Sequence, residues 1–119
     1  MTTFIHQSCE EAYDEIMERL GSNVHNLSPE FNVGLDNLKT YGSKYLIYKS
    51  IMDIHTIPDD VMKQVIGRNG YYFILTTTLC DLDFIWHNTN THQIELWGPS
   101  EENLNNGMME INKRIHKKM

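Results

Sequence analysis

Long apolar runs, paired cysteines and an excess of basic charge are all missing from this 119-residue sequence. No apolar run approaches the ~20 residues that cross a bilayer, and the N-terminus lacks the basic start and apolar stretch of a secretory signal. The two cysteines, Cys9 and Cys80, form no CxxC motif and no disulfide framework. We therefore expect an intracellular protein, cytoplasmic rather than nuclear, with no membrane contact and with both thiols serving as small apolar groups.

The formal net charge of −6 limits the kinds of partner that the chain can hold by charge alone. Residues 1–56 carry eight acidic and four basic side chains, and residues 57–119 carry eight acidic and six basic ones. Four of those six bases stand at the C-terminal end: Lys113, Arg114, Lys117 and Lys118. Because proteins that bind nucleic acid mainly through phosphates are basic, the electrostatic part of any such binding here should be weak.

The N-terminal segment, residues 1–50, is expected to be an extension that contains one amphipathic helix. Ser8 and Glu11 form a capping box, apolar residues recur at helical spacing, and Gly21 is placed to end the helix, which predicts a helix over 9–20. Residues 21–43 are rich in Asn, Ser and Gly and read as a loop, with a short helix after Ser28-Pro29 as an option. The extension either packs on the rest of the molecule and completes its core, or forms an interface with a protein partner or a second copy.

The remaining chain, residues 51–119, alternates between short strand and helix patterns. A β-prone stretch over 45–57 precedes a helix that starts at Pro58, and a second helix follows Gly70 and runs through Cys80. Strands over 82–87 and 93–97 and a last helix after Gly98-Pro99 complete the order. This order predicts an α+β domain of two layers, with the helices on one face of a three-stranded antiparallel sheet.

The sequence from about Ile51 to Ile115 resembles the type I, or eukaryotic-type, KH domains. The segment Val65-Ile66-Gly67-Arg68-Asn69-Gly70 matches the I-G-x-x-G loop of that family, and Ile57-Pro58 matches the entry into its first helix. Further matches are an apolar residue, Phe73, three places after the second glycine, and two strand motifs, Leu82-Asp83-Phe84-Ile85-Trp86 and Ile94-Glu95-Leu96-Trp97-Gly98-Pro99. The final helix also follows in place. One G-x-x-G alone is a weak signal, whereas the same loop among five further features at these separations is a stronger one.

The resemblance implies that this half of the chain clamps about four nucleotides of single-stranded RNA, or of single-stranded DNA. Glycines at a turn between two helices let the backbone approach a sugar–phosphate chain, and amide groups at the following helix can face phosphates. The resemblance assigns Gly67, Arg68, Asn69 and Gly70 to the backbone clamp. It assigns groove walls or base contacts to Lys63, Met62, Ile66, Tyr71, Phe73 and Ile85.

Three positions depart from the family pattern. Lys63 stands where the family commonly has a small residue, and the variable loop, about 88–92, is short. Asp81 replaces the usual glycine at the turn into the second strand, and Asp81 and Asp83 are expected to add negative charge near the groove. These departures predict a reduced contribution of phosphate contacts to binding.

Other candidate sites are weaker in the sequence. The set His55, His87 and His92 lacks metal-ligand spacing, and Cys80 with His87 lacks a third group to orient a nucleophile. Trp86 and Trp97 look like stacking platforms, although tryptophans on strands are more often core residues. We therefore expect no metal, no cofactor and no enzyme activity.

Two functions remain open from the sequence. The first is binding of single-stranded RNA, as a subunit of a ribonucleoprotein or translation-related assembly. The alternative is a KH-fold scaffold for protein interaction, or a homodimer, with little or no direct RNA binding. Net acidity, the short variable loop and the non-basic extension favour the alternative.

Overall fold

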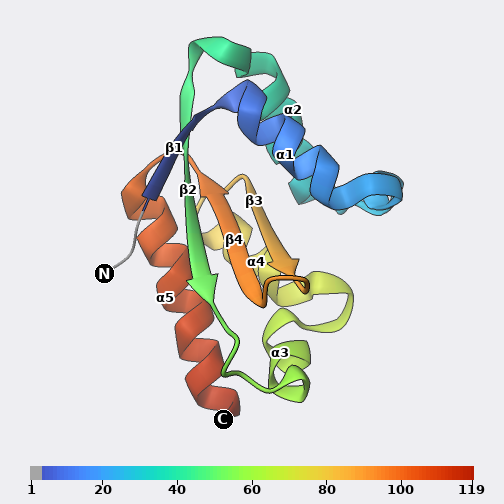
Figure 1. Ribbon diagram of the computed structural model, residues 1–119, viewed down its shortest axis with the longest axis vertical. Coiled ribbons are helices and arrows are strands. Elements are labelled where there is room, and N and C mark those ends of the chain that lie inside the picture. Colours follow the sequence, from blue (N-terminus) through green and yellow to red (C-terminus); the bar gives the residue numbers. More distant parts are fainter. Residues whose placement is uncertain (1–3) are drawn as a thin grey trace.

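The molecule is organised around an antiparallel sheet with strand order β1-β2-β4-β3 (Figure 1). The computed structural model describes residues 4–119. Its strands are β1 (Phe4–Ser8), β2 (Leu46–Asp53), β3 (Phe84–Asn88) and β4 (Gln93–Gly98). The α+β class is as predicted, but the sheet has four strands where three were expected, because residues 4–8 of the extension pair with β2. The predicted boundary between residues 50 and 51 falls inside β2.

The helices of residues 51–119 pack on one face of the sheet, and the helices of the extension pack on the other face. The helices are α1 (Cys9–Leu20), α2 (Pro29–Tyr41), α3 (Asp59–Ile66), α4 (Tyr71–Leu79) and α5 (Glu101–Lys118), with short 3₁₀ turns η1 (Gly21–Asn26), η2 (Gly42–Lys44) and η3 (Arg68–Gly70). Figure 1 shows α1 and α2 together at one end of the sheet, apart from α3, α4 and α5. No helix within residues 4–119 is both long enough and apolar enough to span a bilayer.

Local sequence explains most helix boundaries. The predicted helix over 9–20 is confirmed, with the Ser8 hydroxyl accepting a hydrogen bond from the Glu11 amide at 3.1 Å. The region expected to be a loop contains the 13-residue helix α2, which begins after the N-cap Ser28 with Pro29 in its first turn. Of the two options for residues 21–43, the helix after Ser28-Pro29 is observed, and it is longer than the short helix expected because packing against α1 and β3 stabilises the segment.

Two apolar cores lie on opposite faces of the sheet. One lies among α3, α4 and α5 and includes the fully buried Ile94 and Leu96 of β4. The other lies under α1 and α2 and includes Ile16, Leu38 and Trp97. Of the two alternatives for the extension, packing on the rest of the molecule is observed for residues 4–45. Residues 1–3 of the predicted extension lie outside the described residues.

A buried ionic network joins α1 to the covered sheet face. The Glu95 carboxylate accepts two hydrogen bonds from the Arg19 guanidinium, at 2.9 and 3.0 Å, and one from the Lys49 ammonium at 3.0 Å. Lys49 also pairs with Glu15, and its ammonium lies 4.8 Å from the ring centroid of Trp97. Burial would raise the pKa of Glu95, but the hydrogen bonds from Arg19 and Lys49 outweigh it and lower the pKa below its usual value.

Helix α2 touches the sheet at Gly34. A Cβ atom at this position would stand 2.2 Å from the carbonyl oxygen of Asp83, which is backbone and has little room to move. The close approach of α2 to the start of β3 therefore requires the absence of a side chain at residue 34.

Replacement of Gly34 by alanine should lower the free energy of unfolding by about 2–3 kcal/mol, because the steric clash exceeds the ~1 kcal/mol that alanine contributes in a helix. The control is Val33→Ala in the same helix, where the side chain is 59% exposed and the expected change is within about 0.5 kcal/mol. Urea denaturation of both variants measures the difference. Equal stability of the two variants would contradict the contact.

Glu95→Gln should destabilise the protein by about 3 kcal/mol at neutral pH, because it leaves Lys49 and Arg19 without their shared buried counter-ion. Since the folded pKa of Glu95 is lowered, its contribution is present above the unfolded pKa and is lost as the pH falls through the folded pKa. The difference from wild type should therefore shrink in acid. Urea denaturation at several pH values measures it, with Glu18→Gln on exposed α1 surface as the control that should change little.

Candidate functional site

The predicted Gly-x-x-Gly segment forms a tight connection between α3 and α4. Gly67 ends α3 with φ +81°, and its amide donates to the carbonyl oxygen of Lys63 at 3.0 Å. Asn69 and Gly70 also have positive φ values, +56° and +75°, and the Gly70 amide donates to the Gly67 carbonyl oxygen at 3.1 Å. Glycine suits two of these positions and asparagine tolerates the third, so the residues match the backbone that they must adopt.

Behind the loop, Tyr72 fixes the position of Gly67. A Cβ at Gly67 would stand 2.6 Å from the Tyr72 ring, so ring and backbone are in direct contact. The guanidinium carbon of Arg114, in α5, lies 3.5 Å from the centroid of the same ring. This places one of the C-terminal bases close to the loop, which the sequence did not indicate.

Beside the loop lies an apolar groove of about 200 Å³ between α4 and β3. Residues 51–119 contribute seven side chains or backbone segments to its walls: Ile66, Gly70, Phe73, Phe84, Ile85, Trp86 and His87. The extension contributes Leu20, Leu27 and Phe31. The Phe31 and Phe84 rings lie 4.7 Å apart, and Phe84 and Trp86 are stacked with an interplanar angle of 16°. The groove therefore combines aromatic faces with almost no polar surface.

The predicted site residues fall into four groups. Ile66, Gly70, Phe73 and Ile85 line the groove, while Gly67 forms the loop together with the exposed Arg68 and Asn69. Lys63 is exposed on α3, and Tyr71 is 57% exposed with its ring edge-to-face on Tyr72 at 5.1 Å. Met62 is only 2% exposed and packs in the core.

Sequence reasoning missed the walls that the extension supplies. Phe31 is the residue whose amide donates to the Ser28 hydroxyl, at 3.3 Å, in the first turn of α2. Ser28-Pro29 was the available signal for that helix, but nothing in the local pattern of residues 21–43 indicates which distant strand the helix meets.

His87 at the end of the groove is held neutral by its surroundings. Burial lowers the pKa of its imidazole, with a smaller opposing effect from Asp59 and a lowering one from His92. The groove wall therefore carries no positive charge at neutral pH, and the exposed bases at this site are Lys63 and Arg68. Cys80 is buried, and burial raises the pKa of its thiol, which keeps it protonated and unreactive.

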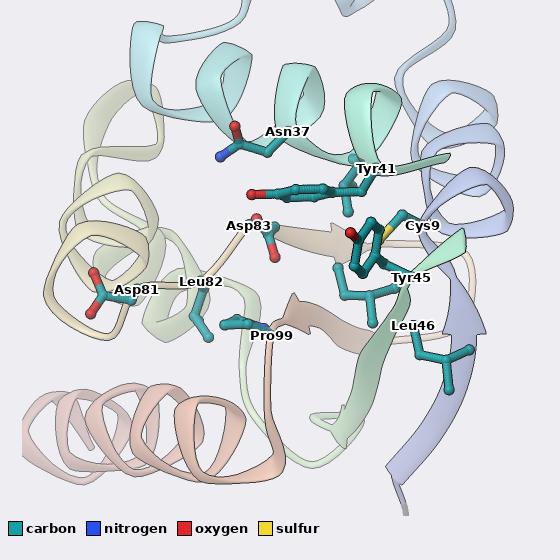
Figure 2. Close-up of a pocket in the computed structure, with 11 residues that line it drawn as sticks. Cys9, Asn37, Tyr41, Tyr45, Leu46, Asp81, Leu82, Asp83 and Pro99 are labelled. Carbon is teal, nitrogen blue, oxygen red and sulfur yellow. The ribbon is translucent and has the colours of Figure 1, made fainter. Parts of the chain in front are cut away.

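Asp81 and Asp83, which were expected to add negative charge near the groove, are not among the residues that line it. They line a separate cavity of about 570 Å³ between the end of α2, the start of β2 and the turn before β3 (Figure 2). Asp81 has φ +54°, a left-handed backbone that aspartate tolerates. Burial raises the pKa of Asp83 to about 6. Within residues 4–119, no group of three or more His, Cys, Asp or Glu side chains is arranged to hold a metal ion.

Asp83→Asn should stabilise the protein at neutral pH by at most about 3 kcal/mol, because it removes a charge that burial disfavours. The folded pKa of Asp83 is raised, so its destabilising effect is absent below the unfolded pKa and grows as the pH rises through the folded pKa. The melting temperatures of wild type and variant should therefore converge near pH ~4 and diverge by pH ~7.5. The control is Asp36→Asn on exposed α2 surface, whose effect should not follow this profile. A constant difference across the pH range would contradict the burial of the carboxylate.

Comparison of the chain with protein-family models, with curated proteins and with solved structures finds no match. A function for this protein is therefore argued from its loop, its groove and its cavity.

Proposed function

We propose that this protein binds single-stranded RNA, or single-stranded DNA, through the Gly67–Gly70 loop and the adjacent apolar groove, as a KH-type domain of type I. The observation that carries the proposal is that the loop borders the groove directly, since Gly70 belongs to both. A backbone turn open to phosphates beside an aromatic hollow suits a chain of alternating charged phosphates and flat bases.

The arrangement of elements also supports a KH-type fold. Leaving β1 aside, the order β2, α3, loop, α4, β3, β4 and α5 agrees with the order expected from the resemblance. The strands β2, β4 and β3 are neighbours in that order and are antiparallel throughout. Helices α3, α4 and α5 share one core on one face of these strands.

Charge sets the expected strength of this binding. The loop has three basic side chains near it, Lys63, Arg68 and Arg114, in a chain whose formal net charge is −6. Two features nevertheless favour contact of bases with the groove. The neutral His87 leaves the groove apolar, and the carboxylates of Asp81 and Asp83 line a different cavity. We expect weak binding that depends strongly on salt, with a partner protein or a second bound module supplying further affinity.

The test compares two variants that make the same change in net charge. Arg68→Asp with Asn69→Asp alters the loop, and Ser43→Asp with Lys44→Asp alters exposed residues of η2, at the opposite end of the molecule from α3 in Figure 1. Asp at residue 69 tolerates the positive φ, so the loop variant should fold. Fluorescence anisotropy with short oligonucleotides at ~50 mM salt should give binding that is about tenfold weaker for the loop variant than for the control.

Three outcomes would contradict the proposal: wild type fails to bind at low salt, both variants weaken equally, or neither weakens. The same oligonucleotides as RNA and as DNA show which nucleic acid is preferred. Nuclear magnetic resonance shifts should cluster at Gly67–Gly70 and at the groove residues of β3.

A scaffold or homodimer function is the alternative, and exposed apolar side chains favour it. Ile5 of β1 and Ile51 of β2 lie on the same sheet face and are 39% and 37% exposed, and Leu46 is 64% exposed. Capture of partners from the native source with and without nuclease separates the two functions, and sedimentation reports a dimer. Partners that are lost entirely on nuclease treatment would count against the scaffold. Neither function assigns a catalytic residue or a cofactor.

A further inference from the structure

The cavity of about 570 Å³ is far larger than the groove and shares no residue with it. Its polar and aromatic lining comes from Asn37, Tyr41, Tyr45, Asp81 and Asp83, and the rest is mainly apolar. These residues come from α2, from the chain before β2 and from the turn before β3, and Figure 2 shows Tyr41, Tyr45 and Asp83 near one another, with Asp81 farther away. Its volume falls in the range of small-molecule sites.

Asp83 is the dominant charge in this cavity. Its side chain is partly buried, and no hydrogen bond or ion pair to its carboxylate is found within residues 4–119. Asp81 adds a second, more exposed carboxylate, and none of the described residues that line the cavity is a Lys, Arg or His. Charges that are withdrawn from water in proteins are normally paired, so this partly buried carboxylate, which lies in an open cavity and has no partner among the described residues, can accept a cation from outside.

Two aromatic rings stand beside this carboxylate. The rings of Tyr41 and Tyr45 pack edge-to-face, with centroids 5.3 Å apart and an interplanar angle of 68°. They are 49% and 59% exposed, so a ligand from solvent can reach both rings. Aromatic faces attract ammonium and guanidinium groups, and a carboxylate beside them adds a counter-ion.

A metal ion fits this lining poorly. Hard cations take six or more oxygen ligands, and softer ones take His or Cys ligands in regular geometry. The cavity presents two carboxylates among tyrosine rings and apolar side chains, and Cys9 is a buried thiol whose pKa is raised by burial and by Asp83. The lining therefore suits a cation that carries carbon.

We infer that this cavity binds an organic cation, an alkylammonium or alkylguanidinium group, with Asp83 as its counter-ion and Tyr41 and Tyr45 as its aromatic walls. The same group can come from a free small amine or from a lysine or arginine side chain of a peptide. The inference stands apart from nucleic-acid binding, because its residues and its ligand charge are different from those of the loop and the groove.

The test is a ¹⁵N nuclear magnetic resonance titration of the full chain with L-arginine amide. Both ligands are used with the α-amine acetylated, so that the guanidinium is the only charge on the arginine amide and the ligand control, L-citrulline amide, is its uncharged isostere. Saturable shifts should map to Asn37, Tyr41, Tyr45 and the segment Asp81–Asp83, and citrulline amide should not produce them. Asp83→Asn should weaken binding at least about tenfold, and Asp36→Asn, which makes the same charge change outside the cavity, should not.

Tyr41→Leu provides a second variant that keeps the carboxylate and removes an aromatic wall, and it should weaken binding about threefold to tenfold. Titration with the tripeptide Gly-Arg-Gly, acetylated at its N-terminus and amidated at its C-terminus, distinguishes the sources: tighter binding than arginine amide indicates a peptide ligand, and equal binding indicates recognition of the cation alone. Shifts scattered over the surface, equal binding by citrulline amide, or unchanged binding by Asp83→Asn would overturn the inference.

Discussion

The contact on which the rest of the structure depends is the pairing of Glu95 with Arg19 and Lys49 beneath α1. It places two opposite charges, Lys49 and Glu95, on a sheet face that also carries Trp97. Each charge would be costly to bury alone, and together with Arg19 they form a specific anchor. Because Arg19 stands on α1, the anchor determines how the extension lies on the sheet. The position of α2, which packs against α1, follows from it.

This arrangement explains why both hollows of the molecule are shared between the extension and the rest of the chain. The extension provides three walls of the groove beside the loop, and α2 and the chain after it provide most of one side of the larger cavity. Without the extension, the rest of the chain would keep the Gly67–Gly70 loop, but the groove and the cavity would each lose part of their walls. The two candidate sites are therefore properties of the whole chain.

Local patterns in the sequence predicted the elements whose signals are local. The capping box at Ser8 predicted α1 to the residue, and the glycines at 67 and 70 predicted the break between α3 and α4. Strand β1 and most of α2 were missed because their stability comes from partners far along the chain. The pattern around Lys49 and Glu95 resembles a solvated strand face, and only burial by α1 makes these charges internal. For the same reason the walls at Phe31 and the cavity around Asp83 had no local signal.

The absence of a side chain at Gly34 has one further consequence. It holds the middle of α2 against the start of β3, while Phe31 at one end of the helix reaches the groove and Tyr41 at the other reaches the cavity. The groove and the cavity are therefore both lined by residues of α2, on either side of its contact with the sheet at Gly34. Thermodynamic linkage then requires reciprocity: if occupancy of either hollow shifts α2, each ligand changes the affinity of the other by the same factor.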